Sequence, residues 1–307
     1  MINRTRSPRD QTTDPIKASV IIPTYNAAET IVDCLESILP QAGDCNAEVL
    51  IIDSSDDGTR DIVQNVFPDV SVLALPKKTA SAVSRNLGAR VAKANVLVFI
   101  DADCIPRDGW LNKILQSDFG ELKAVGGSIG VYDRRNLLGL QLYFLEFSES
   151  LPHSERRFVE RLPSCNLACQ KEAFKRVGGF PVEYEASHDM VLTWRLSRLG
   201  RLLFEPSARV DHVNKRGLRL VYKYAYGLGF WSGRMWGKTS FPRARLVRKR
   251  CFLPFFPAVR AAILHRRLWR YDIGLWCLWL LTLPLYLSVV TAWTVGFGIG
   301  MREIDRL

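Results

Sequence analysis

The chain has 307 residues, of which 48% are hydrophobic, so it can bury the core of one large domain with an appendage and is not expected to be disordered. Its net charge of +11 comes from one stretch: residues 212–270 hold 15 Lys or Arg and no Asp or Glu, whereas the remainder carries 27 basic and 31 acidic residues. The seven cysteines form no Cys-x-x-Cys pair and have no histidines at zinc-ligand spacing, which predicts reduced, structural thiols in a cytosolic setting.

A polar arm opens the chain, and predicted strands and helices then alternate up to residue 105. Residues 1–16 lack the apolar segment of a secretory signal peptide, so we expect a flexible arm and a chain whose bulk is not exported by that route. Apolar runs and helical spacing predict strands at 18–23, 48–53, 70–74 and 96–100, and helices around 31–38, 62–66 and 80–94. This alternation predicts an α/β fold with a doubly wound, mostly parallel sheet and helices on both faces.

Polar residues follow three of these strands: Thr24–Asn26, Asp53, and Asp101 with Asp103. The carboxyl ends of parallel strands open onto one crevice, so these side chains are expected to lie close together. Because residues two apart in an extended segment point the same way, Asp101 and Asp103 can reach one hard cation and, through it, a diphosphate. This predicts a divalent-metal site, although an isolated Asp-x-Asp after a strand is also commonly a turn or a helix cap.

The next hundred residues continue the α/β pattern with more irregular spacing. We expect short helices at 110–115 and 171–177, a glycine-interrupted strand at 124–131, an apolar and therefore buried helix at 137–147, and a strand at 163–169 in which Asn166 faces a ligand or the backbone. Asp189 begins a helix, where it serves either as a general base or as a first-turn carboxylate favoured by the helix dipole. His212 follows the strand-like run 208–211 and is either a ligand or a structural histidine.

Five motifs together resemble the family 2 glycosyltransferases of the GT-A fold: Val20–Asn26, Asp53 with Asp56–Thr59, Ser84–Gly88, Asp101–Asp103 and His188–Asp189. The resemblance covers about residues 18–212 and implies a Rossmann-like GT-A domain, which we place at 17–215. It also implies an inverting transfer from a nucleotide-diphospho-sugar donor, such as a UDP-, GDP- or dTDP-sugar, assisted by Mn²⁺ or Mg²⁺. Residues 233–236 read Gly-Arg-Met-Trp without the glutamine of processive synthases, which argues against a long-polymer synthase.

The same resemblance implies roles for individual residues. It assigns the sugar nucleotide to Pro23, Thr24, Tyr25, Asp53, Arg85 and Asp101, and we add Asn166 as a candidate from its place on the predicted strand 163–169. It assigns the metal to Asp103, with Asp101 in the metal shell and His212 near the metal or the diphosphate. Asp189 matches the general base, although such enzymes carry Glu-Asp where this chain has His188 and Asp189.

The last third of the chain has the composition of a membrane-associated segment. Residues 216–270 are basic and aromatic, which predicts interfacial helices, and no nucleic-acid-binding motif accompanies the charge. Residues 273–301 contain no charged residue or histidine, and these 29 positions exceed the roughly 20 needed to cross a bilayer. We therefore predict one transmembrane segment at 271–301 and a tail at 302–307, with a buried core helix as the alternative. The basic residues that precede the segment predict a cytoplasmic catalytic domain.

The combined features predict a membrane-bound transferase whose acceptor hydroxyl or phosphate belongs to a polyprenyl-linked, glycolipid or glycan molecule. One alternative is a haloacid-dehalogenase-like phosphatase, because Phe99–Asp103 is also similar to that family's nucleophile motif. Ile105 and the late position of the motif disfavour it. The other alternative is a non-catalytic, membrane-anchored sugar-nucleotide-binding protein. The joint presence of Asp53, Asp101, Asp103 and Asp189 argues against it.

Overall fold

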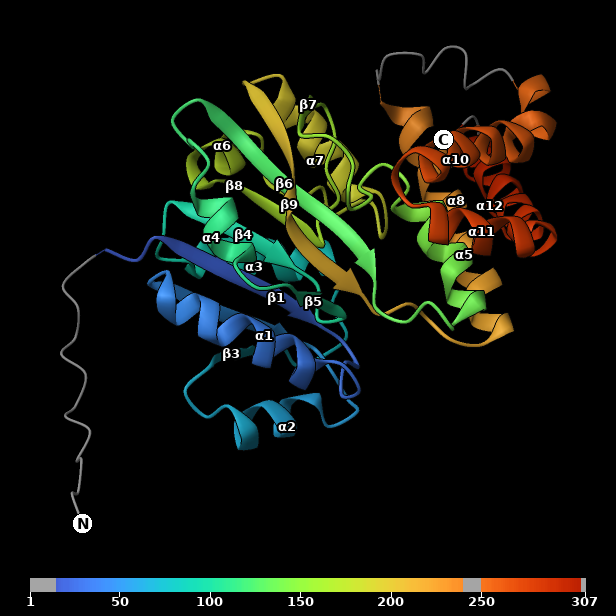
Figure 1. Ribbon diagram of the computed structural model, residues 1–307. Helices are drawn as coiled ribbons and strands as arrows, with labels where there is room; N and C mark the ends of the chain where they lie inside the picture. Colours follow the sequence, from blue (N-terminus) through green and yellow to red (C-terminus); the bar gives the residue numbers. More distant parts are fainter. Residues whose placement is uncertain (1–14, 240–249, 305–307) are drawn as a thin grey trace.

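A computed structural model describes residues 15–239 and 250–304 of the chain. A nine-stranded mixed sheet with helices on both faces forms its centre, and the helices of the carboxyl-terminal third pack together beside the sheet (Figure 1). The predicted α/β fold with helices on both faces is thus confirmed. The predicted arm falls almost wholly on residues 1–14, which lie outside the described residues.

The first half of the sheet is parallel throughout. Its elements are β1 (Ala18–Thr24), α1 (Ile31–Asp44), β2 (Ala47–Asp53), α2 (Thr59–Val66), β3 (Ser71–Ala74), α3 (Ser81–Val91) and β4 (Val96–Ile100). The strands lie in the order β3-β2-β1-β4, and Thr24 at the end of β1 pairs with Asp53 at the end of β2. Successive residues of β1 pack against helices on opposite faces, Ile22 in the same cluster as Leu35 of α1 and Ile21 with Ala82 of α3.

The second half of the sheet is mixed. Its elements are β5 (Cys104–Pro106), α4 (Trp110–Leu115), β6 (Leu122–Val131), α5 (Leu137–Glu146), β7 (Arg157–Val159), β8 (Asn166–Gln170), α6 (Lys171–Arg176), α7 (His188–Ser197) and β9 (Arg201–His212). The order continues β4-β8-β6-β9-β5, with β7 beside β9, and β8 is antiparallel to β4 and β6. As a result, Asn166 at the start of β8 lies opposite Ile100 at the end of β4, and Cys104 of β5 lies opposite His212 at the end of β9.

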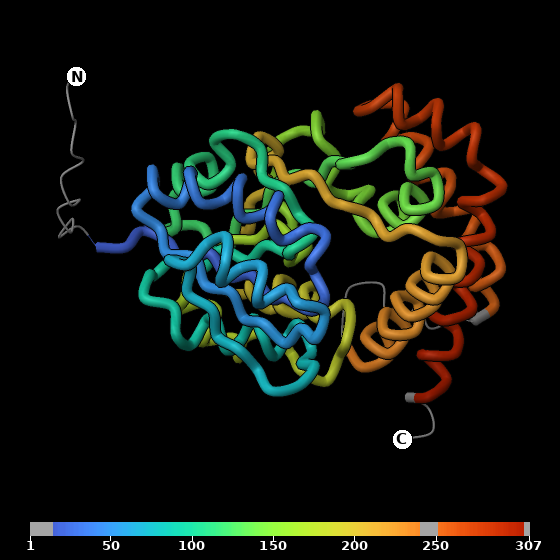
Figure 2. The backbone as a smooth tube through the Cα atoms, turned by 90° about the horizontal axis from the view of Figure 1, so that it is seen from below, coloured from blue at the N-terminus to red at the C-terminus, as the bar shows by residue number. Residues whose placement is uncertain are grey.

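The carboxyl-terminal helices are α8 (Leu218–Lys238), the 3-10 turn η1 (Arg250–Phe255), α10 (Phe256–Tyr271), α11 (Ile273–Leu281) and α12 (Leu283–Ile304). Figure 2 shows them along one side of the sheet domain, with α5 next to them. Helices α8 and α12 run parallel at very close range, because Gly229 and Gly233 of α8 face Trp293 and Phe297 of α12. A Cβ atom added to Gly229 would lie 1.9 Å from the carbonyl oxygen of Trp293.

The uncharged stretch 273–301 forms two helices, α11 and α12, and the single transmembrane segment at 271–301 stays a prediction. The Asp272 side chain accepts a hydrogen bond from the backbone N–H of Leu275 (2.9 Å) and caps α11, which ends at Leu281. Pro284 lacks an N–H group and cannot continue the helical ladder of α11. Among the described helices only α12 is long and apolar enough to cross a bilayer, and 44% of its apolar window is buried in the protein. Burial of this kind is also expected if α12 is a core helix of the protein and does not cross a membrane.

Candidate active site at the carboxyl edge of the sheet

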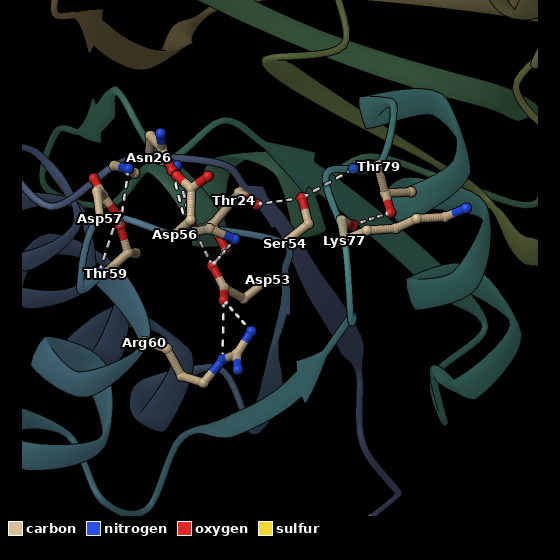
Figure 3. A network of polar contacts seen from close by, with 12 residues as sticks. Thr24, Asn26, Asp53, Ser54, Asp56, Asp57, Thr59, Arg60, Lys77 and Thr79 are labelled. Atoms are coloured by element: carbon tan, nitrogen blue, oxygen red, sulfur yellow. Dashed lines mark hydrogen bonds and ion pairs between the residues drawn. The ribbon is translucent and has the colours of Figure 1, made fainter.

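The loops that follow β1 and β2 are held together by the carboxylate of Asp53 (Figure 3). This buried carboxylate accepts hydrogen bonds from the hydroxyl groups of Thr24 (2.8 Å) and Ser55 (2.6 Å), and it forms an ion pair with Arg60 at 3.0 Å. Through these contacts Asp53 orders the loops that carry Pro23, Thr24 and Tyr25, and its contact with the nucleoside stays a prediction.

Tyr25 is the predicted nucleoside contact that is open to solvent. Its side chain is 39% exposed, and the ammonium group of Lys78 lies 4.6 Å from the centre of its ring. Thr24, by contrast, is buried and its hydroxyl is used by Asp53. An exposed aromatic ring with a cation beside it can take a nucleobase by stacking, with the cation near the phosphates.

Arg85 reaches from α3 to both Asp101 and His188. Its guanidinium forms an ion pair with Asp101 and lies 2.9 Å from Nε2 of His188. Burial and the charge of Arg85 lower the pKa of His188 to about 3, so the imidazole is neutral and its Nε2 accepts a hydrogen bond from Arg85. The side chain that replaces the usual acidic residue before Asp189 thus helps to position Arg85.

Asp103 lies between two basic side chains, His212 and Lys215. Its carboxylate is 3.6 Å from Nε2 of His212 and 3.1 Å from Nζ of Lys215. Burial opposes ionisation of Asp103, but the nearby charges of His212 and Lys215 outweigh it and hold the pKa of this carboxyl below its usual value. Asp103 is therefore ionised at neutral pH, as a metal ligand must be.

The groups around Asp103 fit a divalent cation only in part. Ligand atoms of Asp103, Cys104 and His212 lie within 4.8 Å of one another. Burial raises the pKa of the Cys104 thiol well above its usual value, so it stays protonated and is a poor ligand for Mg²⁺ or Mn²⁺. The carboxylate of Asp103 and the imidazole of His212 suit these ions. Asp101 forms an ion pair with Arg85, and its place in the metal shell stays a prediction.

Asp189 is the first-turn carboxylate of α7, as predicted. Oδ1 accepts a hydrogen bond from the backbone N–H of Met190 (2.8 Å) and Oδ2 from that of Ser164 (3.2 Å). Burial raises the pKa of Asp189 above its usual value despite these bonds. A carboxylate held in place with a raised pKa has the properties of a general base, and its place at the helix start also satisfies the helix-dipole explanation.

Asn166 faces the backbone, which is one of the two orientations expected for it, and it is not among the residues that line the cavity described below. The side chain is fully buried: its oxygen accepts from the indole N–H of Trp110 (2.8 Å), and its NH₂ donates to the carbonyl oxygens of Ser128 and Ala208 (3.0 and 2.9 Å). Because β8 enters the sheet between β4 and β6, the side chain is enclosed among strands rather than placed at their edge.

One cavity of about 980 Å³ joins the predicted groups. Its walls include Arg85, Asp101, Asp103, Asp189 and His212, and it continues along the segment 142–165 to helices α8, α10 and α12. The predicted base, the predicted metal ligands and the carboxyl-terminal helices therefore line the same cavity. Pro23, Tyr25 and Asp53 are not among its lining residues.

Two side chains of the cavity were not predicted from the sequence, Lys215 and Glu146. The place of Glu146 in the cavity and the charge of Asp103 raise its pKa above its usual value, although the side chain is exposed to solvent, which screens these effects. Both could have been predicted as site residues from the sequence. Lys215 lies three residues after His212, and Glu146 is the one carboxylate within the apolar run 137–147.

Comparison with known proteins identifies the family. The model of glycosyl transferase family 2 matches residues 19–177, slightly more than half of the chain. The chain belongs to glycosyltransferase family 2. It is 28% identical over 192 residues to the glycosyltransferase AglE of Haloferax volcanii, and this match covers 59% of the chain and 62% of AglE. The chain thus spans about three fifths of the length of that relative.

This family 2 glycosyltransferase is also similar to a second relative and to a solved structure. The glucosyl-dolichyl phosphate glucuronosyltransferase of Haloferax volcanii is 22% identical over 238 residues, which cover 71% of the chain and 75% of that protein. The mannosyltransferase PcManGT of Pyrobaculum calidifontis, solved with GDP-Man and Mn²⁺, has a TM-score of 0.63 at 19% identity and covers 95% of this chain and 89% of its own. The predicted GT-A fold is thereby confirmed.

Proposed function

We propose that this family 2 glycosyltransferase is an inverting enzyme that moves a sugar from a nucleotide-diphospho-sugar to an acceptor hydroxyl. The observation that carries the proposal is that Asp189, Asp103 and His212 line one cavity. An inverting transfer is a single displacement, which needs one base for the acceptor's proton and positive charge for the departing diphosphate. Asp189 is the base in this proposal.

Asp103 and His212 would hold Mn²⁺ or Mg²⁺, which supplies positive charge to the diphosphate when bound. Lys215 and Arg85 provide further positive charge on the cavity wall, and Arg85 is kept in place by His188. PcManGT was solved with GDP-Man and Mn²⁺, which supports this class of donor and cofactor. UDP-, GDP- and dTDP-sugars all remain candidates for the donor.

We further propose that the acceptor is linked to a lipid and that the catalytic domain lies at the cytoplasmic face of a membrane. Helix α12 is long and apolar enough to span a bilayer, and the residues before it are rich in arginine. The relative named as a glucosyl-dolichyl phosphate glucuronosyltransferase supports a polyprenyl-linked acceptor.

The two alternative functions gain nothing from these findings. The family match supports a glycosyltransferase and not a phosphatase. Asp101, the residue a phosphatase would use as nucleophile, is paired with Arg85. A non-catalytic sugar-nucleotide-binding protein would not need Asp189 held in place on the wall of the cavity.

Donor binding tests the proposal. UDP-, GDP- and dTDP-sugars are added with Mn²⁺, and thermal unfolding of the full chain is followed. One of them should raise stability by about 2.7 kcal/mol at a hundred times its dissociation constant. Asp103→Ala should abolish the Mn²⁺-dependent part of this shift while the protein stays folded, because the variant lacks the carboxylate proposed to bind the ion. Turnover that is undiminished in EDTA would contradict the metal assignment.

A further inference from the structure

Arginine side chains gather at the helical end of the cavity, away from the proposed base and metal ligands. Arg161, Arg260 and Arg267 line this end, and we call them the arginine cluster. All three act on one carboxylate, Glu149: Arg267 forms an ion pair with it at 3.0 Å, and the charges of all three hold the pKa of Glu149 below its usual value.

The arginine cluster has more positive charge than its surroundings compensate. Arg260 donates to the carbonyl oxygen of Leu145 (2.7 Å) and lies 4.4 Å from the ring of Trp293, but it forms no ion pair with any described residue. Arg161 forms neither a hydrogen bond nor an ion pair within residues 15–239 and 250–304. Three guanidinium groups therefore share a single carboxylate that is itself 57% exposed. Guanidinium groups in such an arrangement favour an oxyanion, and phosphate most of all.

The wall next to the arginine cluster is apolar. On α10, Phe256, Val259 and Ile263 line the cavity from the same helix as Arg260 and Arg267, and Trp293 and Phe297 of α12 line it too. The spacing of 256, 259, 260, 263 and 267 places these side chains on one face of α10. A ligand that fills this end of the cavity must therefore carry an anionic group and a hydrocarbon part together.

The turn after α5 separates the arginine cluster from the reaction centre. Glu146 feels the charges of Asp103 and Asp189, whereas Glu149, three residues later, feels those of the arginine cluster. Between them, the ring of Phe147 packs against His212 at 4.9 Å. An anion bound by the arginine cluster thus lies apart from Asp189, with room for another group of the same molecule at the base.

We propose that the arginine cluster binds the phosphate of an amphiphilic acceptor in which a sugar is joined through that phosphate to a hydrocarbon chain. The phosphate takes the place of the Glu149 carboxylate, and the chain lies along the apolar wall of α10 and α12. The sugar then presents its hydroxyl at Asp189. This last placement rests on the proposed transferase function, whereas binding of the phosphate and the chain does not.

Binding of farnesyl phosphate to the full chain in phosphatidylcholine nanodiscs tests this proposal, with the emission of the cavity tryptophans as readout. Farnesyl phosphate should bind saturably, and farnesol and inorganic phosphate should each bind at least about tenfold more weakly. Arg267→Gln should weaken the binding of farnesyl phosphate at least about tenfold, because the variant loses a charged hydrogen bond between the guanidinium and the phosphate. Arg266→Gln, one residue away on α10 but exposed and outside the cavity, is the matched control and should change binding less than about twofold.

A gain-of-function variant guards against misfolding as the explanation. Glu149→Gln removes the carboxylate that competes with the phosphate for the arginine cluster. The affinity for farnesyl phosphate should therefore rise several-fold. Equal losses in the Arg267 and Arg266 variants, or inorganic phosphate that competes as well as farnesyl phosphate, would overturn the proposal. Donor binding is measured in parallel with sugar nucleotide and Mn²⁺. Its failure in the wild-type protein would contradict the transferase function and leave the farnesyl phosphate result standing.

Discussion

At the scale of single residues, Glu146 is a carboxyl whose protonation in the folded protein differs from that in the unfolded chain. Its folded pKa is raised from an ordinary value of 4.5 to about 8 by desolvation in the cavity and the charge of Asp103, and solvent that reaches the exposed side chain makes the effect on stability smaller than for a buried group. Between these two values the folded state binds more protons than the unfolded state, so this group lowers stability as pH rises from about 4.5 to 8.

Glu146→Gln should therefore stabilise the protein more at pH 8 than at pH 5. The glutamine keeps the shape of the neutral acid and cannot acquire the charge. Melting temperatures of wild type and variant across this range check the prediction. A difference between the two proteins that does not change with pH would show that the pKa of Glu146 is not raised in the folded protein.

Residues at the ends of elements were predicted better than residues inside the sheet. Asp103 and Asp189 follow a strand and begin a helix, so local pattern was enough to place them at the crevice. Asn166 also begins a strand, but that strand is antiparallel and lies between β4 and β6, so its side chain is enclosed. The strand order that decides this depends on long-range pairing, which no local pattern reveals.

At the scale of elements, the contact between α8 and α12 depends on glycines. Any Cβ atom at Gly229 would meet the backbone of Trp293, whereas Gly227, two residues earlier, has no neighbour within 4 Å among the described atoms. Gly229→Ala should therefore force the two helices apart and cost about 1–3 kcal/mol. Gly227→Ala should leave stability unchanged or raise it by about 0.5–1 kcal/mol, since alanine is the better helix former.

Unfolding of both variants in the same detergent measures this difference. Equal stability of the two would contradict the close parallel packing of α8 and α12. The glycines fall in two pairs, 229/233 and 296/300, each four residues apart, and could have predicted two facing helices. Composition alone instead favoured interfacial helices followed by one span, because charge and hydropathy do not reveal where a helix breaks or what it packs against.

At the scale of the whole molecule, the carboxyl-terminal helices both complete the cavity and carry the proposed membrane contact. Residues of α12 belong to the same buried core as β1 and α5, so deletion of the helix would disturb the sheet domain as well as the anchor. Membrane attachment is therefore best tested on the intact chain.

Flotation with phosphatidylcholine vesicles provides that test. If α12 is inserted, the protein should float with neutral vesicles and stay bound in 1 M NaCl, where the screening length falls to about 3 Å. Anionic lipid in the vesicles should add only a salt-sensitive contribution to the free energy of membrane binding, about 1 kcal/mol for each basic residue at the surface. Complete release by salt would contradict insertion and favour the core-helix alternative for α12.

The central claim is that Asp189 removes the acceptor's proton while other residues hold the donor. Asp189→Asn keeps the size of the side chain and one acceptor oxygen but removes the base. We predict that sugar-nucleotide affinity, measured with Mn²⁺, stays within a few-fold of wild type while turnover falls by roughly 10²–10⁴, the usual contribution of a positioned general base. Turnover that survives this substitution would contradict the account and place the base elsewhere.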